Sequence, residues 1–212
     1  MAESLAQRER AELSQLLAQL GPDAPTICTG WRTRDLASHL WLRESKPLAA
    51  AGMFVPFLAG ERRKAEAEAA AFAWPELIAK VADGPPKLSP FGLPQVDALA
   101  NSNEFFIHHE DVRRGQPDWQ PRIMSRQDND KLWSGVGVMG LLGARKAPVG
   151  VTLRRSDTGA EKTLSKKSEQ VTVVGEPGEL LMFVTGRGEH AKVEFIGSES
   201  AVAALKGAKF SL

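Results

Sequence analysis

Apolar residues recur at helical spacing through most of the first 147 positions of the chain. A helix is predicted over residues 3–20, and four leucines mark its apolar face: Leu13, Leu16, Leu17 and Leu20. Gly21-Pro22 ends this pattern, because glycine favours a helix end and proline cannot continue the helix. A second helix is predicted from Thr33, which is a suitable N-cap, to Lys46-Pro47.

Further helices are predicted before residue 147. Residues 49–82 contain broken helices, which end before Gly84-Pro85-Pro86. The next helix starts near Val96 and ends at Gly115-Gln116-Pro117. The last spans residues 128–145 although it contains four glycines, which we interpret as positions of close helix packing.

After Ala147-Pro148 the pattern changes to short segments rich in β-branched residues, which are typical of strands. Such strands are predicted at residues 149–153, 170–174 and 191–196. A short helix from Pro177 to Gly186 separates the last two strands, and another helix is predicted over residues 198–205. The predicted fold class is therefore α+β, with a helical bundle in residues 1–147 and a small α+β domain in residues 148–212.

Charge and composition narrow the class of protein. The 212 residues include 27 basic and 26 acidic side chains, a balance that argues against general binding of nucleic acids or membrane surfaces. No apolar run approaches the ~18 residues of a spanning helix, and the acidic N-terminus is unlike a signal peptide. Cys28 is the single cysteine, so an intrachain disulfide is impossible. We therefore expect a cytoplasmic protein, and no protein partner is predicted.

One segment carries most of the candidate chemistry. Glu104, His108 and Asp111 are spaced at i, i+4 and i+7, so they project from one face of a helix. His39 lies on the second predicted helix, and apolar residues flank it as they flank His108. Polar groups in apolar surroundings need partners, which a metal would supply. Two helices side by side would present His39, Glu104 and His108 to one divalent metal, with positions left for water or a thiol.

Several neighbours of these residues keep alternative roles. His109 lies about 100° around the helix from His108, so it is expected to support the site or line its wall rather than to bind metal. Asp111 is expected to orient an imidazole, and binding of the metal through water is the alternative. Cys28 has three interpretations: a fourth ligand, a site of mixed-disulfide formation with a small thiol, and a small buried apolar residue, which is the commonest role of a lone cysteine.

Arginines are the candidates for recognising an anionic substrate or a polar thiol cofactor. Arg113 and Arg114 follow the helix that carries His108, and Arg43 and Arg187 could reach a cleft between the two domains. The alternative for Arg43, Arg113 and Arg114 is plain solvation, which is the state of most exposed arginines. Arg187 is the one assigned to cofactor binding, because it lies in a predicted turn at a helix end.

Three motifs occur in a defined order along the chain: Gly30-Trp31-x-x-Arg34-Asp35-Leu36-x-x-His39-Leu40, Glu104-x-x-x-His108-x-x-Asp111, and Gly175-Glu176-Pro177-Gly178-Glu179-Leu180-Leu181 with Thr185-Gly186-Arg187. Together they resemble the mycothiol-dependent maleylpyruvate isomerase-like family, and in particular its actinobacterial branch of metal-binding proteins. This family belongs to the DinB-like superfamily of four-helix bundles. The resemblance extends over nearly the whole chain.

The resemblance implies an N-terminal DinB-like four-helix bundle that holds a metal, usually zinc, at His39, Glu104 and His108. It also implies that the metal binds the thiolate of mycothiol, which adds to an electrophilic substrate. The complete substrate pocket of the isomerase has no match in this sequence, so the substrate is left open. The partners implied are thus a small-molecule thiol and an electrophile.

Three hypotheses follow for the function. The first is a mycothiol-dependent enzyme that catalyses thiol addition, transfer or isomerisation with a metal-activated thiolate. The second is a non-catalytic protein that binds a metal or a thiol. The third is a helical interaction module in which the triad no longer binds metal. Thiol-dependent turnover separates the first from the others, and metal content separates the third.

Overall fold

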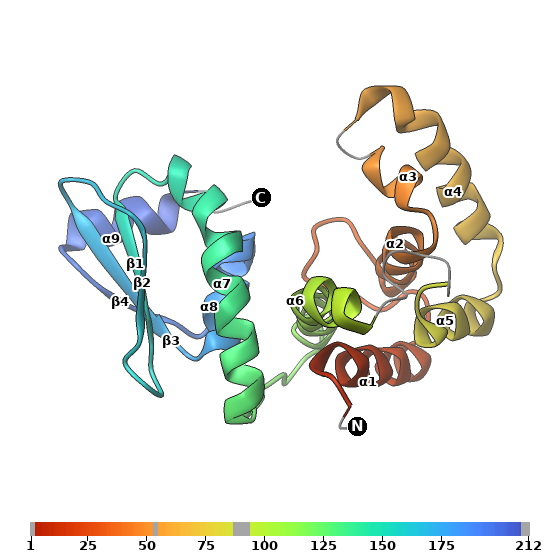
Figure 1. Cartoon of the computed structure of the whole chain (residues 1–212), viewed down its shortest axis with the longest axis horizontal. Coiled ribbons are helices and arrows are strands. Elements are labelled where there is room, and N and C mark those ends of the chain that lie inside the picture. Colours follow the sequence, from red (N-terminus) through yellow and green to blue (C-terminus); the bar gives the residue numbers. More distant parts are fainter. Residues whose placement is uncertain (1–2, 53–54, 87–93, 209–212) are drawn as a thin grey trace. The chain divides into compact units, whose positions relative to one another are not determined.

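The computed structural model describes residues 3–52, 55–86 and 94–208. It combines helices with a β-sheet, as the predicted α+β class requires (Figure 1). The chain divides between Trp119 and Gln120 into two compact units. This differs from the boundary predicted at residue 147, because helix α7 (Arg126–Lys146) packs against elements of the second unit.

The first unit is helical, and its elements are α1 (Leu5–Leu20), α2 (Thr33–Ser45), α3 (Pro47–Ala51), the 3-10 turn η1 (Pro56–Leu58), α4 (Ala59–Ala71), α5 (Trp74–Asp83) and α6 (Pro94–Arg113). Helix α1 packs along α6 and against α5, while α2 packs against α4 and α5 (Figure 1). Fully buried side chains from three helices meet in one core: Leu13 and Leu17 of α1, Leu36 and Leu40 of α2, and Phe105 of α6.

Local hydrogen bonds explain where α1 and α2 begin. Ser4 caps α1, because its hydroxyl accepts a hydrogen bond from the Gln7 N–H at 3.2 Å. At the start of α2, Asp35 accepts a hydrogen bond from the Arg32 N–H at 2.8 Å. Arg32 is therefore the N-cap, in place of the predicted Thr33. The Thr33 hydroxyl instead donates to the Gly21 carbonyl at 2.6 Å and so joins the start of α2 to the end of α1.

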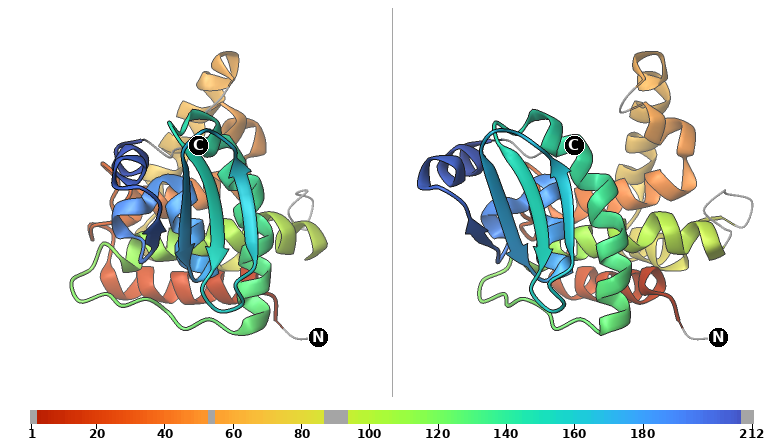
Figure 2. Two further views of the ribbon diagram at one scale, coloured as in Figure 1. Left: turned by 90° about the vertical axis from the view of Figure 1, so that its left-hand side faces the viewer. Right: turned by 60° about the vertical axis from the view of Figure 1, so that its left-hand side comes forward.

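The second unit is built on a sheet whose order, in the described residues, is β2-β1-β3-β4. The strands are β1 (Gly150–Arg155), β2 (Glu161–Ser165), β3 (Gln170–Gly175) and β4 (Glu194–Ile196), with β1 and β3 parallel and the other pairs antiparallel. Helix α8 (Pro177–Met182) packs against both α7 and the sheet, and it continues into the π-helical turn η3 (Phe183–Arg187). A 3-10 turn η4 (Gly188–His190) follows. Helix α9 (Glu199–Gly207) packs against β3 on the side away from α7 (Figure 2).

The sequence pattern predicted most of this unit correctly. Strands β1, β3 and β4 and helices α7, α8 and α9 all lie at or near their predicted positions. Strand β2 was missed, because its sequence Glu-Lys-Thr-Leu-Ser is largely polar and only Leu164 is buried. The prediction of close packing at the glycines of α7 is confirmed at Gly140, where a Cβ atom would lie 2.7 Å from Leu164 Cδ1.

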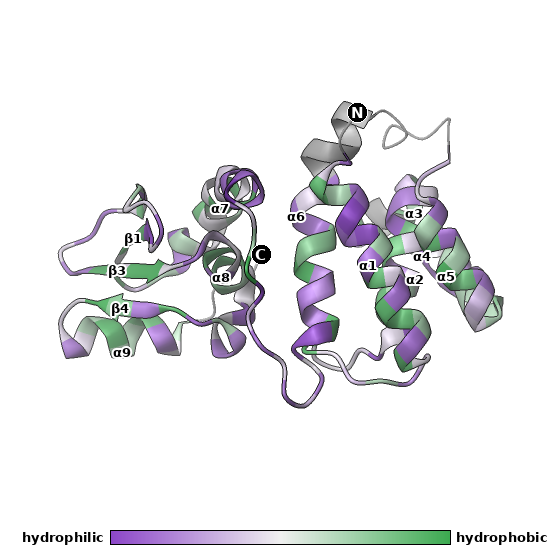
Figure 3. Ribbon diagram, turned by 90° about the horizontal axis from the view of Figure 1, so that it is seen from below, coloured by the Kyte–Doolittle hydropathy of each residue, from purple (hydrophilic) through white to green (hydrophobic). Residues whose placement is uncertain are grey.

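Helix α6 positions most of the candidate site, and the coloured part of this helix in Figure 3 carries both apolar and polar residues. Phe105, Phe106 and Ile107 are buried, and so are His108 and His109. The helix therefore carries its polar side chains into packed surroundings, where each needs a partner. Within the described part of the chain, we find no helix with the length and apolarity needed to cross a bilayer.

Candidate metal centre

Helices α2 and α6 bring His39, Glu104 and His108 together. Glu104 Oε1 lies 3.2 Å from His39 Nε2 and 3.4 Å from His108 Nε2. Glu104 and His108 share one face of α6 because they are four residues apart, and His39 approaches that face from α2. The sequence predicted this set, and the structure places its donor atoms next to one another.

The donor atoms fit a divalent cation. Two imidazole nitrogens and one carboxylate oxygen lie within 4.8 Å of one another. Two imidazoles and one carboxylate are a common ligand set for zinc and for related divalent metals, and they leave coordination positions for an exogenous ligand. The side chains of His39 and Glu104 are 18% and 22% exposed, so the cluster is partly buried and can be reached from solvent.

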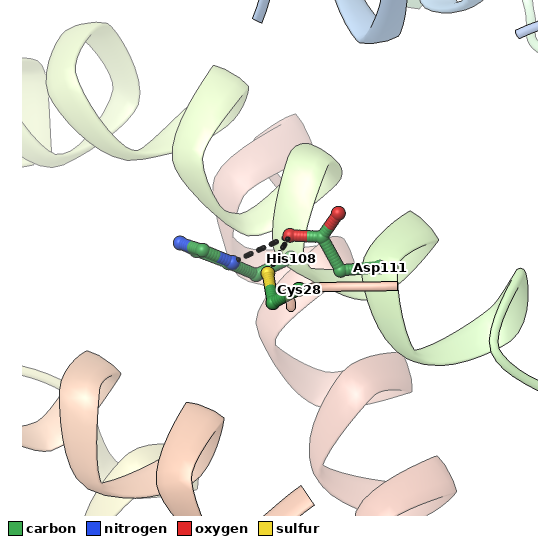
Figure 4. Close-up of side chains that lie close together, drawn as sticks. All are labelled: Cys28, His108 and Asp111. Carbon is green, nitrogen blue, oxygen red and sulfur yellow. Dashed lines mark hydrogen bonds and ion pairs between the residues drawn. The ribbon is translucent and has the colours of Figure 1, made fainter. Parts of the chain in front are cut away.

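Asp111 and Cys28 support His108 from its other side (Figure 4). Asp111 is completely buried, and its Oδ2 lies 2.9 Å from His108 Nδ1. The Cys28 thiol, from the loop between α1 and α2, donates to the same oxygen at 3.1 Å. With a proton on Nδ1, His108 keeps the lone pair of Nε2 for a metal. This position supports the orienting role predicted for Asp111, and it gives Cys28 a polar contact that the sequence did not indicate.

Trp31 and a neighbouring cavity complete the surroundings. The Trp31 ring lies 5.2 Å from the His39 ring and 6.5 Å from the His108 ring, measured between centroids. Trp31 and His39 also line a cavity of about 390 Å³, together with residues of α2, α3 and α4. Its remaining lining residues are Gly30, Arg34, Asp35, Ser38, Leu42, Ala49, Arg62, Glu66 and Ala70. A small molecule in this cavity would therefore contact one of the candidate ligands.

Burial and hydrogen bonding shift the pKa values of all three residues. Burial lowers the pKa of His39 below 6.5. Burial also disfavours the charged form of His108, but hydrogen bonds with Asp111, Cys28 and Glu104 raise its pKa well above 6.5. For Glu104, burial alone raises the pKa, yet hydrogen bonds with His108 and His39 hold it well below its usual range. Without a metal, these hydrogen bonds therefore favour the protonated form of His108 and the charged form of Glu104.

Arg43 was interpreted as a solvated residue, and the structure corrects this. Its side chain is 20% exposed, and its Nε lies 3.3 Å from Glu104 Oε1. It also donates a hydrogen bond to Asn101 Oδ1. Asn101 in turn donates to Glu44 at 2.7 Å, and Arg10 of α1 binds Glu44 through two hydrogen bonds. The spacing of His39 and Arg43, one helical turn apart, was the sequence signal that they share a face.

His109 faces α1 rather than the candidate centre. Its Nδ1 lies 2.8 Å from Glu9 Oε2, and both side chains are buried. The predicted exclusion of His109 from the triad agrees with this position. Glu9, Glu12 and His109 also form a group with metal-ligand geometry, but the direct contact between Glu9 and His109 already joins α1 to α6.

The other arginines singled out in the sequence have structural partners. Arg113 and Arg114 both bind Glu110, at 2.7 Å and 2.6 Å, and Arg114 is buried. Solvation was therefore the wrong interpretation for Arg114. Arg187 donates to the Thr185 carbonyl at 2.6 Å within the second unit. Its role in cofactor binding stays a prediction.

The fold and the cluster together define an α+β protein with two histidines and one carboxylate grouped on its helical unit. Two crystal structures are similar to this chain: a mycothiol-dependent maleylpyruvate isomerase and a histidine-to-alanine mutant of that enzyme. Each is 14% identical, has a TM-score of 0.60, and is matched over 90% of this chain and 90% of its own. The likeness establishes the fold. Neither a family model nor the sequence of a curated protein matches the chain.

Proposed function

We propose that this protein is a mycothiol-dependent enzyme of thiol addition, transfer or isomerisation, and that it holds a divalent metal, zinc first, at His39, Glu104 and His108. The convergence of both Nε2 atoms on Glu104 Oε1, at 3.2 and 3.4 Å, carries the proposal. A metal in this site supplies Lewis acidity, which lowers the pKa of a bound thiol and yields a nucleophile near neutral pH.

The chain's own residues would each have a part in this chemistry. Asp111 fixes the ring of His108 so that Nε2 faces Glu104. Trp31 lies against both histidines and limits the access of water to them. The cavity beside His39 offers room for the thiol or the electrophile. Arg187 is retained as a proposed contact for the cofactor.

The structural neighbours support this assignment. The proteins of similar fold are a mycothiol-dependent isomerase and its mutant, and the likeness extends over both units. We further assign the helical unit to the DinB-like four-helix bundles, and the packing of α1 against α5 and α6 and of α2 against α5 is compatible with that. The identity of the electrophile is left open.

Metal content tests the centre. We expect purified protein to carry about one divalent ion per chain. Most of this metal should be lost in each of three variants, because the two ligands that remain would bind the metal weakly. The variants are His39→Ala, Glu104→Ala and His108→Ala. Elemental analysis measures this, with His190→Ala of the second unit as the control that keeps its metal. Wild-type metal content in any two of the three triad variants would overturn the assignment.

Thiol binding tests the function. In the cobalt-substituted protein, a thiolate that coordinates the metal adds a charge-transfer band in the near ultraviolet, which water does not. We expect this band with mycothiol, and at lower concentrations than with glutathione. If no band develops at saturating mycothiol while cobalt is confirmed in the site, the thiol-dependent function is wrong and a non-catalytic or water-based role replaces it.

A further inference from the structure

Arg43 is held at the edge of the candidate centre by a chain of buried polar groups. Asn101 is fully buried, accepts a hydrogen bond from Arg43 and donates one to Glu44 at 2.7 Å. Glu44 is buried and bound by both terminal nitrogens of Arg10, at 2.6 and 2.8 Å. Because each link fixes the next, the position of the Arg43 guanidinium is set by the core of the unit as well as by Glu104.

Arg43 thus brings a positive charge to the same carboxylate that the proposed metal would bind. Arg43 Nε lies 3.3 Å from Glu104 Oε1, the same oxygen that both histidines contact. Glu104 contributes the single negative charge of the triad, since the other two ligands are neutral when they bind metal. A divalent ion and the guanidinium would therefore compete for one carboxylate oxygen and repel each other. An anion on the metal would relieve that repulsion and be attracted by both charges.

We propose that Arg43 couples the metal to a monoanionic ligand: it opposes binding of the cation alone and favours the cation together with a thiolate or another single negative charge. The inference rests on the proposed metal centre, but it does not depend on mycothiol as the thiol. The alternative is that Arg43 only holds Glu104 in place. The loss of Arg43 would then weaken metal binding both with and without an anion, which is the opposite prediction.

The experiment uses the full chain, zinc or cobalt as the metal, and azide as the monoanion. Zinc affinity is measured by competition with a chromophoric chelator at several azide concentrations, and azide affinity is measured from the visible spectrum of the cobalt protein. The variants are Arg43→Gln and Arg43→Lys. The control is Arg154→Gln, which removes an exposed arginine of the second unit that pairs with Glu161 at 2.6 Å.

For Arg43→Gln we expect zinc affinity without azide to exceed that of the wild type, and azide to bind the metal-loaded protein about tenfold more weakly. By linkage, azide at concentrations that saturate both metal-loaded proteins should then enhance zinc affinity about tenfold less in this variant. Arg43→Lys should keep part of the enhancement because it keeps the charge, and Arg154→Gln should match the wild type.

Three outcomes overturn the inference. The first is that the zinc affinity of Arg43→Gln falls equally with and without azide. The second is that Arg43→Gln binds azide as tightly as the wild type does, and the third is that the wild type binds neither zinc nor cobalt. If Arg43→Gln does not fold, the same comparison is made with Arg43→Lys, and azide binding equal to that of Arg154→Gln counts against the inference. Azide coupling without mycothiol binding would refute the proposed function and leave this inference standing.

Discussion

His108 has a different carboxylate at each of its ring nitrogens. Asp111 contacts Nδ1 at 2.9 Å, and Glu104 contacts Nε2 at 3.4 Å. The imidazolium form satisfies both, which explains why the pKa of His108 is raised even though burial opposes its charge. A metal can bind Nε2 once the proton on that nitrogen leaves. The proton on Nδ1 stays, because it is hydrogen-bonded to Asp111.

Zinc binding near pH 7 is therefore expected to release about one proton from His108. Zinc affinity should fall as the pH drops through the raised pKa of His108, and this decline begins above the value of about pH 6 that ordinary histidines would give. In the metal-free protein the sign is opposite: protonated His108 stabilises the fold at low pH, and that contribution is lost as the pH rises through its folded pKa.

Titration calorimetry in buffers of different ionisation enthalpy counts the released protons, and Arg154→Gln is a control of unchanged proton count. Zinc binding without proton release at pH 7 would show that His108 is neutral before the metal arrives.

The spacing of residues on a helix determined how much of the site the sequence could predict. Glu104 and His108 are four residues apart, so their shared face follows from local geometry. Cys28 and Asp111 are 83 positions apart in the sequence, and their hydrogen bond depends on how the loop before α2 returns to α6. Arg43 was misjudged for a related reason, because an arginine's long side chain reaches solvent or a buried partner according to the tertiary fold.

At the scale of elements, buried polar pairs hold the helices of the first unit to one another. Arg10 of α1 binds Glu44 of α2 through two hydrogen bonds, and Glu9 of α1 contacts His109 of α6. Both members of each pair are nearly inaccessible to water. Removing one member leaves a buried charge without its partner, which costs more than the pair itself contributes.

Arg10→Met is accordingly expected to lower the free energy of unfolding by about 3–5 kcal/mol. Urea denaturation followed by circular dichroism measures the change. Arg62→Ala is the control: its pair with Glu66 is exposed on α4, so the loss should stay below about 1 kcal/mol. Equal losses in the two variants would mean that the Arg10 pair does not behave as a buried one.

Elements with a clear periodicity were predicted well, and elements defined by their neighbours were not. Helix α1 follows repeating apolar positions, and helices α1, α2, α6 and α7 end at glycine or proline, or just before them. Strand β2 has little pattern of its own and is a strand because β1 pairs with it through residues such as Leu153 and Lys162. The boundary between the units was misplaced for the same reason, since the helical pattern of α7 does not reveal which unit its apolar face covers.

The chain consists of two compact units, and all three proposed metal ligands belong to the first. Differential scanning calorimetry of the full chain should therefore resolve two transitions. Zinc at about 100 times its Kd should raise the transition of the first unit by about 10 °C and leave the other in place. Glu104→Ala should abolish the shift. A zinc-induced shift of both transitions would show that the units unfold together.

The separation of His39 from Glu104, 65 positions along the chain, also bears on when the proposed metal could bind. On a ribosome, the chain exposes His39 long before the other two ligands exist, and α6 alone offers only a two-residue chelate. A complete binding site requires closure of a long loop by the folding of the first unit, which costs entropy and takes time. We therefore expect the proposed metal to bind late, so that a tightly bound ion would mark a helical unit that has finished folding.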